Sequence, residues 1–539
     1  MSTRVAVLGG GVGGLSAAQE LAERGFEVAV YERRPDFGGK ARSIPVPNSA
    51  TPGRKPLPGE HGFRFFPSFY KHLPDTMKRI PFAGKSVFDN LVFSTRVQIA
   101  RTGKTAFLEP TRFPETLDDW TTVFKSLFSN LGIPDSELLF FIDRLLVLLT
   151  TCPERRVAEY ENIAWWDFID AKNKSLSYQR YLGEGLTRSL VAMKAEISST
   201  RTVGYIDLQL MQGLMCSPGG FDRVLNGPTN EAWVDPWIAY LKTLGVNLQG
   251  SSVVRSIELD GRRVSKVLID QSGKVSPISA DFYVSALPVE IMTGLLTDEI
   301  KDAAPSLANL DKLQTRWMNG IQFYLKSDVS LVHGHSNYLD SPWALTSISQ
   351  KQFWPGIDFA GLGDGKVGGV LSVDISDWDA PGILYGKPAT QCTAEEIKNE
   401  AWAQLKAHLN TGGGEPIRDD NLLAWFLDPD IQFPNPSAAT NAEPLLINPA
   451  GSLQYRPQAA TEIPNLFLAS DYVRTYTDLA TMEGANEAAR RSVNALIDAS
   501  GSTAPKAQLW PFQEPEIFKP MRDYDLLRFR LGLPHGKAL

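Results

Sequence analysis

The N-terminal part of the chain alternates short apolar runs with a helical pattern. The run Val5–Leu8 is typical of a strand that is buried on both faces. The segment Leu15–Arg24 predicts a helix that ends at Gly25. A second apolar run, Phe26–Tyr31, follows, and the acidic Glu32 ends it. The pattern therefore predicts a strand–helix–strand unit with parallel strands.

Glycine dominates the turn between the first strand and the helix, with the spacing Gly9-x-Gly11-x-x-Gly14. The first glycine permits a tight turn, the second lets the backbone approach a pyrophosphate, and the third allows close packing of helix on strand. The helix N-terminus then offers its N–H groups to the phosphates. Glu32 follows Gly14 by 18 residues, where an acid accepts hydrogen bonds from ribose hydroxyls. The unit predicts a dinucleotide site.

The acid and the turn after it narrow the choice of nucleotide. Glu32 would repel a 2′-phosphate, so NADP is not expected. A second glycine turn, Gly38-Gly39-Lys40, and then Arg42 follow the second strand. A simple dehydrogenase has no need of this turn, whereas in flavoproteins such a turn brings backbone and a cation to the same pyrophosphate. The order of motifs favours FAD over NAD.

Length and composition exclude several classes of protein. A chain of 539 residues is too long for one hydrophobic core, so two or more domains are expected. The net charge of −7 argues against a nucleic-acid binder. The three cysteines and six histidines show no ligand spacing. We therefore expect no disulfide framework and no metal site, and a reducing compartment, the cytoplasm, fits.

No apolar run reaches the roughly 18 residues that suggest a spanning helix. The pattern places the start of the fold at about Arg4, and no signal peptide is expected. The longest run, Leu138–Thr150, includes Asp143 and Arg144 and predicts a buried helix. The alternative is an apolar lip at a membrane surface, and the protein would then be peripheral there. The basic and apolar tail, 515–539, would pack on the body, pair subunits or touch anionic lipid.

Three further blocks resemble the flavin amine oxidase and phytoene desaturase superfamily, and the resemblance covers nearly the whole chain. Cys216–Ile269 is similar to the family's middle block, in which a strand contacts the adenine; Val253 and Val254 would lie on it. Ala280–Pro288 resembles the strand that returns to the cofactor domain. Asn465–Ile497 resembles the family's last cofactor block most closely.

In that last block the family has an apolar strand, an Asp that contacts the flavin's sugar-alcohol chain or phosphates, and a helix whose N-terminus points at the ring. Here the strand is Leu466–Ala469, the acid is Asp471, and the helix opens near Thr481. The family's Ala-Gly-Asp is Ala469-Ser470-Asp471 in this chain, which keeps a small residue. The resemblance implies FAD bound by Gly9, Gly11, Gly13, Gly14, Glu32, Arg33, Gly39, Lys40, Arg42, Gly62, Val254, Asp471, Met482, Glu483 and Ala485.

The segment Gly59–Phe69 follows the second glycine turn, as the family's flavin-facing segment does. Gly62 would permit close approach to the ring, and Glu60, His61 and Arg64 are the candidate catalytic groups. Glu60 would act as a base or stabilise a carbocation-like intermediate, and His61 would move a proton. In the alternative, Glu60 and Arg64 pair with each other or with the pyrophosphate and only hold the loop, and His61 is a satisfied loop histidine.

The resemblance implies an α/β fold, a Rossmann-type FAD-binding domain with an interleaved α+β substrate domain. The first insert is expected to be mostly helical. The second should alternate strands with helices, and we expect the strands Gly320–Leu325 and Val367–Val373 and the helix Ala394–Leu409. The predicted boundaries are 1–75, 210–290 and 425–500 for the FAD domain, 76–209 and 291–424 for the substrate domain, and 501–539 for a C-terminal extension.

Three functions remain open from the sequence. The segment Glu60–Pro81 most resembles bacterial carotenoid-desaturase-like and hydroxysqualene-dehydroxylase-like proteins. This resemblance implies the first function: desaturation, dehydroxylation or isomerisation of an apolar isoprenoid or lipid-like substrate. The second function is an oxidase of a soluble amine or amino acid; against it, Thr315–Leu325 lacks the lysine that amine oxidases place near the flavin. The third is a non-catalytic FAD-bound scaffold. The electron acceptor would be oxygen or a quinone, unless the cycle is redox-neutral.

The aromatic residues that would suit an apolar tunnel, or an ordinary core, are Phe63, Phe65, Phe66, Phe69, Trp165, Trp166, Trp317, Phe323, Tyr324 and Trp354.

Overall fold

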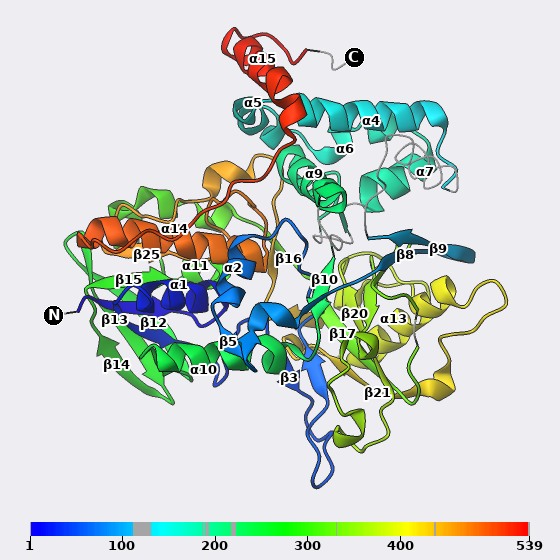
Figure 1. Ribbon diagram of the computed structural model, residues 1–539, viewed down its shortest axis with the longest axis horizontal. Helices are drawn as coiled ribbons and strands as arrows, with labels where there is room; N and C mark the ends of the chain where they lie inside the picture. Colours follow the sequence, from blue (N-terminus) through cyan, green and yellow to red (C-terminus); the bar gives the residue numbers. More distant parts are fainter. Residues whose placement is uncertain are drawn as a thin grey trace.

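A five-stranded parallel sheet forms the centre of the cofactor half of the molecule (Figure 1). The computed structural model describes residues 2–111, 131–185, 187–188, 193–216, 222–329, 331–435 and 438–536. The strands pair in parallel throughout. Their order is β11 (Asn247–Gln249), β2 (Glu27–Tyr31), β1 (Arg4–Leu8), β15 (Phe282–Ser285) and β25 (Leu466–Leu468).

Both faces of this sheet are covered, as a parallel sheet requires. Val5 and Val7 of β1 pack in a core with helices on one face, while Ala6 and Leu8 pack in a second core on the other. The helices of the first face are α1 (Val12–Ala22), α10 (Asp235–Thr243) and α14 (Met482–Ser500). The second face carries an antiparallel sheet and two helices: β12 (Ser252–Asp260), β13 (Arg263–Gln271), β14 (Lys274–Ile278), α11 (Val289–Leu295) and α12 (Asp298–Ala303).

A seven-stranded mixed sheet, with α13 (Ala394–Leu409) packed on it, builds the substrate half. The expected strands and helix of this half are present, and α13 has the bounds that the sequence predicts. The strand order is β21 (Leu422–Leu427), β17 (Asn319–Leu325), β20 (Gly369–Ile375), β19 (Thr346–Ser349), β18 (His335–Tyr338), β8 (Arg96–Arg101) and β9 (Lys104–Pro110).

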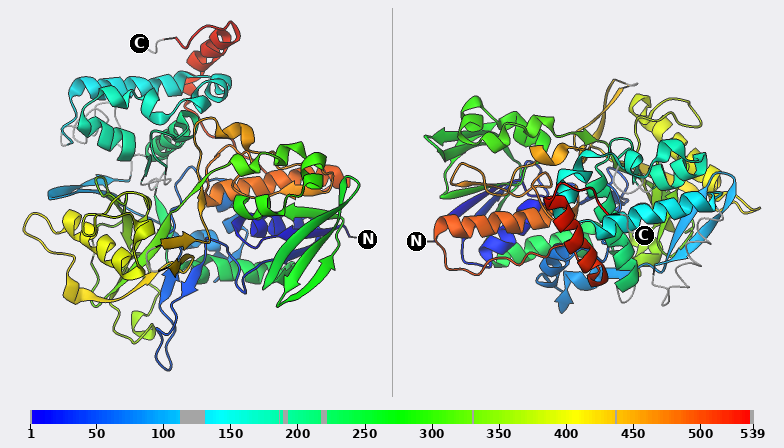
Figure 2. Two further views of the ribbon diagram at one scale, coloured as in Figure 1. Left: turned by 180° about the vertical axis from the view of Figure 1, so that it is seen from behind. Right: turned by 90° about the horizontal axis from the view of Figure 1, so that it is seen from above.

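A group of helices lies above both halves and ends with the C-terminal helix (Figures 1 and 2). Within it, Phe141, Leu145 and Leu148 pack against Trp165 and Val203. The run Leu138–Thr150 is thus a helix whose apolar face is buried, as the simpler interpretation expects. Among the helices that the structure describes, none could span a membrane. The group consists of α4 (Asp135–Thr150), α5 (Pro153–Ala158), α6 (Trp165–Phe168), α7 (Leu176–Tyr178), α9 (Thr200–Cys216) and α15 (Lys519–Arg530).

Four elements differ from the sequence-based division of the chain. The first insert contains β8 and β9, so it is less helical than expected. Helix α9 crosses the predicted boundary at 210, and β21 crosses the boundary at 425 to join the substrate sheet. A buried strand has the same apolar pattern in either sheet, so its sequence does not say which sheet it joins. Shorter elements used below are β3 (Ser43–Pro45), β4 (Pro58–Glu60) and α2 (His72–Lys78).

Candidate functional site

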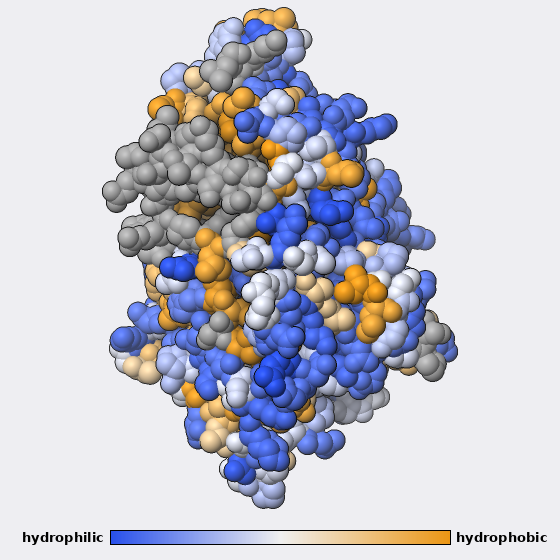
Figure 3. Space-filling model, turned by 90° about the vertical axis from the view of Figure 1, so that its right-hand side faces the viewer, coloured by the Kyte–Doolittle hydropathy of each residue, from blue (hydrophilic) through white to orange (hydrophobic). Residues whose placement is uncertain are grey.

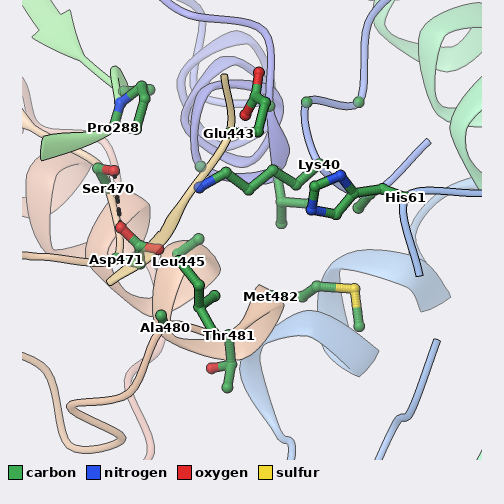
Figure 4. Close-up of a pocket in the computed structure, with 18 of the residues that line it drawn as sticks. Lys40, His61, Pro288, Glu443, Leu445, Ser470, Asp471, Ala480, Thr481 and Met482 are labelled. Atoms are coloured by element: carbon green, nitrogen blue, oxygen red, sulfur yellow. Dashed lines mark hydrogen bonds between the residues drawn. The ribbon is translucent and has the colours of Figure 1, made fainter. Parts of the chain in front are cut away.

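A cavity of about 530 Å³ lies between the cofactor half and the substrate half (Figure 4). Its volume is in the range of small-molecule and cofactor sites. On the cofactor side it is lined by the residues that follow the carboxyl ends of β1, β2 and β25, where open α/β sheets bind ligands. On the other side it is lined by residues of α9 and of the substrate sheet.

The first glycine turn forms one wall, and Gly9, Gly13 and Gly14 have no room for a side chain. A Cβ at Gly13 would lie 2.0 Å from the Ala469 carbonyl oxygen, and one at Gly14 would lie 1.9 Å from the Gly9 carbonyl oxygen. Gly9 also has a φ of +103°. Gly9, Gly11 and Gly13 line the cavity, whereas Gly14 packs α1 against the turn. The backbone therefore stays open to a ligand at this wall.

The second glycine turn contacts the first directly. Gly38 N donates a hydrogen bond of 2.8 Å to the Gly10 carbonyl, and a Cβ at Gly39 would lie 2.9 Å from Gly11 Cα. Lys40 extends from this turn along the cavity, and its ammonium donates to the Pro444 carbonyl (Figure 4). Two backbone turns and one cation thus converge on a single place, as pyrophosphate binding requires.

Glu32 is fixed at the end of β2 and lines the cavity. Its carboxylate accepts hydrogen bonds from Gly10 N at 2.7 Å and from Arg34 N at 3.0 Å. A carboxylate has about four acceptor positions, so two hydroxyls could still be bound. The neighbouring Arg33 also lines the cavity and pairs with Glu443.

Arg42 lies outside the lining, behind the second glycine turn. Its guanidinium donates to the Gly39 carbonyl and lies 3.4 Å from Asp430. Burial, together with the charge of Arg34, lowers the pKa of Arg42. Arg42 therefore stabilises the turn, and its position does not bring it into contact with a ligand in the cavity.

The N-terminus of α14 points at the cavity (Figure 4). Thr481 caps this helix and accepts a hydrogen bond of 3.0 Å from Gly484 N, and Met482 and Ala485 line the cavity. Asp471, held 3.3 Å from Ser470 Oγ, lies beside the same end. The N-terminus of α1 faces the cavity as well, so two helix dipoles place partial positive charge on it. On the second face of the sheet, Val253 and Val254 of β12 also line the cavity, as expected.

Glu483 does not line the cavity, although it follows Met482. Its carboxylate accepts hydrogen bonds from Lys71 N, His72 N and Leu73 N and lies 2.8 Å from His72 Nδ1. Burial raises the pKa of Glu483, but His72 and the N–H donors outweigh burial and hold it below its usual range. In the first turn of α14 this side chain turns toward α2, so it ties the two helices together.

Glu60 is also directed away from the cavity. Its carboxylate accepts hydrogen bonds from Ser43 Oγ at 2.7 Å and from Thr229 N at 3.1 Å, and it lies 3.6 Å from Arg64 Nη2. This is the alternative in which Glu60 and Arg64 pair and hold the loop. A role of Glu60 as a base at the ring is not supported by this geometry, because its oxygens are engaged on the far side of β4. Arg64 does line the cavity and donates to the Lys40 carbonyl at 2.8 Å.

His61 lines the cavity and lies against two buried aspartates. His61 Nδ1 is 2.6 Å from Asp428 Oδ2 and 3.9 Å from Asp430. Burial raises the pKa of Asp428, but His61 outweighs it and lowers the pKa overall. The three residues are close enough to hold a cation. Arg34 and Arg42 already pair with Asp430, however, and their charges would repel a metal ion.

The sequence did not identify Asp374, which lines the cavity from β20. The strand is buried along its whole length, so nothing in its pattern separates Asp374 from a core position. Among the expected aromatic residues, Phe63, Phe65 and Phe69 line the cavity. The others lie in or against hydrophobic cores: Phe66, Trp165, Trp166, Trp317, Phe323, Tyr324 and Trp354.

Comparison with known proteins agrees with this geometry. Residues 12–497 match the family described as flavin containing amine oxidoreductase. The chain is 24% identical over 522 residues to a 15-cis-phytoene desaturase of Synechococcus elongatus, and the aligned region covers 92% of this chain and 96% of that protein. It is 22% identical over 523 residues to a zeta-carotene desaturase of Synechocystis sp., with 92% and 97% covered.

Solved structures show the same fold. A cyclohexylamine oxidase from Brevibacterium oxydans superimposes with a TM-score of 0.59 at 13% identity, covering 93% of this chain and all of that one. A putrescine oxidase bound to putrescine gives a TM-score of 0.61 at 12% identity, with 92% and 99% covered. At these identities the likeness concerns the fold alone. The family match over nearly the whole chain, together with the two glycine turns and the two helix N-termini at one cavity, shows that the protein belongs to the flavin-containing amine oxidoreductase family, whose members bind FAD.

Proposed function

We propose that this protein binds FAD in the cavity and moves a hydride between the flavin and an apolar, isoprenoid-like substrate. The dinucleotide end is supplied by the first glycine turn, Glu32 and Lys40. The other end is supplied by Asp471 and the N-terminus of α14. When bound, FAD provides a two-electron acceptor or donor at the boundary of the two halves.

The apolar wall beyond the cofactor end is the observation that carries this proposal. Phe63, Phe65 and Phe69 line it from the segment after the second glycine turn, and Ile206 and Leu210 line it from α9. Such walls exclude water and bind a long hydrocarbon by burial of apolar surface. The similarity to carotenoid desaturases over nearly the full chain supports the same substrate class.

The described residues favour an apolar substrate over an amine. Lys40 is the one lysine of the described cavity lining, and its ammonium already donates to the Pro444 carbonyl. Strand β17 carries no lysine, and Lys326 beyond its end donates to the Asp420 carbonyl. The free lysine that amine oxidases of the family place near the flavin therefore has no counterpart among the described residues that line the cavity. The oxidase and the non-catalytic scaffold are therefore outcomes of the test below.

Anaerobic mixing of the FAD-loaded protein with two kinds of compound tests this function. Acyclic isoprenoid polyenes in micelles should bleach the flavin and yield a product that lacks two hydrogens, while primary amines should not. Bleaching by amines, with peroxide formed on admission of air, would indicate the oxidase. No bleaching by either class would indicate the scaffold. Admission of oxygen or a quinone to the reduced protein then identifies the acceptor.

A variant of the apolar wall sharpens the test. Leu210→Glu places a charge on the wall and should abolish reduction by polyenes while FAD remains bound, because burial of an unpaired carboxylate opposes an apolar ligand. Leu176→Glu makes the same change at a side chain that is exposed on α7 and outside the cavity. It should leave reduction unchanged.

A further inference from the structure

Asp374 has an unusual position for a carboxylate in the middle of a sheet. It lies on β20, is 5% exposed, and turns into the cavity beside the loop that carries Gly62. A Cβ at Gly62 would lie 2.7 Å from Asp374 Oδ1. Gly62 packs directly against Oδ1, which is buried, while the Asp374 side chain as a whole lines the cavity.

The oxygen that faces Gly62 has no hydrogen-bond partner in the described part of the chain. The charged groups that act on Asp374 are Arg64, His61 and His335, and Phe63 N donates to it. Each of these side chains is engaged elsewhere: Arg64 by the Lys40 carbonyl, His61 by Asp428, and His335 by Asp222 at 2.6 Å. No salt bridge within 4.0 Å joins Asp374 to a described cation.

The neighbouring buried aspartates show what pairing does to such a group. Asp428 lies against His61, and its pKa is lowered. Asp430 lies against two arginines. At Asp374 burial dominates over Arg64 and His61 and raises the pKa to about 7. A carboxyl that lines the cavity and has a pKa near neutral pH has the properties of a general acid–base.

We propose that Asp374 is the proton-transfer residue of this site, with its carboxylate accepting the proton that the substrate loses together with its hydride. The inference rests on the proposed function. Forming a double bond breaks two C–H bonds of the substrate. One hydrogen leaves as hydride to the flavin, which is the oxidant, and the other leaves as a proton to the Asp374 carboxylate. The electron pair of the second C–H bond becomes the new π bond, and Asp374 becomes neutral.

The Asp374→Asn variant keeps the shape of the side chain and removes its basicity. With FAD bound, flavin reduction by a polyene should slow by about 100-fold or more, the usual contribution of a general base. Asp328→Asn is the matched control, because Asp328 lies near the other end of β20, outside the cavity, and accepts from Ser349 Oγ. Reduction of Asp374→Asn at the wild-type rate would overturn the proposal.

The apoprotein gives a second readout that needs neither FAD nor turnover. Infrared spectra of the wild type should show a protonated-carboxyl C=O band that disappears as pH rises through about 7. Asp207, whose pKa burial raises to about 8, contributes a band of its own, so the difference between wild type and Asp374→Asn isolates Asp374. Asp328→Asn should keep the full band.

The two readouts separate the failure of each claim. If the band in Asp374→Asn titrated as it does in the wild type, the raised pKa would not belong to Asp374. A wild-type flavin that no polyene reduces would overturn the proposed function, and the proton transfer with it, while the infrared band still reports the ionisation of Asp374 independently.

Discussion

At the scale of single residues, Gly13 tests the phosphate turn most sharply. A Cβ there would meet the Ala469 carbonyl at 2.0 Å, which forces α1 away from β25. Gly13→Ala should therefore lose bound FAD and reduce stability by about 1–3 kcal/mol, as overpacking does. Absorbance of bound flavin and thermal unfolding measure the two effects. The control is Gly294→Ala in α11, where a Cβ meets nothing within 4 Å; it should weaken neither FAD binding nor stability. If Gly13→Ala retained FAD, the role of Gly13 in the phosphate turn would be wrong.

A second residue-scale prediction concerns Asp207 of α9. Burial raises its pKa to about 8, and Oδ2 has no partner among the described residues. The folded protein keeps this proton up to about pH 8, whereas the unfolded chain releases it near pH 4. Stability therefore falls as pH rises between these values, by about 1.4 kcal/mol per pH unit at most.

Asp207→Asn removes this dependence. Its melting temperature relative to wild type should rise steadily from about pH 4 to about pH 8 and then level off. Asp260→Asn, at an exposed position of β12, should show no such trend. A constant difference between Asp207→Asn and wild type across this range would contradict the raised pKa.

The sequence predicted those site residues that a local motif defines. Gly9, Gly11, Glu32, Lys40 and Asp471 belong to strand-end motifs, and all of them line the cavity. Side-chain direction was less predictable. Glu60, Glu483 and Arg42 lie beside lining residues in the chain but turn toward neighbouring elements. Asp374 reaches the cavity only through pairing of strands far apart in the sequence, so no local pattern marks it.

At the scale of elements, the N-cap of α14 is expected to contribute both to the stability of the helix and to the binding of the cofactor, and the two effects can be measured separately. Thr481→Ala removes the cap at the cavity and should cost about 1 kcal/mol of stability. It should also weaken FAD binding, because fraying of the first turn disturbs the N–H groups that face the ligand.

Thr393→Ala is the matched control, since Thr393 caps α13 in the substrate half and lies outside the cavity. It should cost a similar amount of stability and leave the dissociation constant of FAD unchanged. Denaturant unfolding of the apoprotein and a fluorescence titration with FAD measure the two quantities. Equal effects of the two variants on FAD binding would contradict the assigned role of the α14 N-terminus.

Elements with a strong pattern of their own were predictable. The capping box of Thr393 and Glu396 and the periodic apolar positions after it define α13. The apolar runs of β17 and β25 were located to within a residue. β8 and β9 were missed because their alternating patterns are short and weak, and only the pairing of β8 with β18 and of β9 with β8 completes them.

At the scale of the whole molecule, the C-terminal helix presents an apolar outer face. One side of α15 packs on the body, where Asp525 pairs with Arg155 at 3.0 Å. The other side and its flanks expose large apolar side chains that are 47–79% accessible, and apolar groups are visible at this end of the molecule (Figure 3). They are Ile517, Met521, Tyr524, Leu527 and Leu531.

We propose that this face, with the exposed Arg530 beside it, contacts an anionic membrane from which an apolar substrate is taken. The wild type should float with vesicles that contain phosphatidylglycerol. The triple variant Met521→Glu, Leu527→Glu and Leu531→Glu should not float. The control variant Val275→Glu, Ile383→Glu and Leu384→Glu adds the same charge at exposed apolar positions elsewhere and should float as wild type does. A wild type that fails to float would contradict membrane contact.

We expect FAD to bind in one cavity, between the two glycine turns and the N-termini of α1 and α14. Its binding is measured by the visible absorbance of the purified protein after dialysis against FAD, with the bound flavin counted per chain. The wild type should show an oxidised-flavin spectrum with one FAD per chain, and Gly13→Ala should show none. A colourless wild-type protein that cannot be loaded with FAD would show that the cavity is not a flavin site and would overturn the roles assigned to both glycine turns.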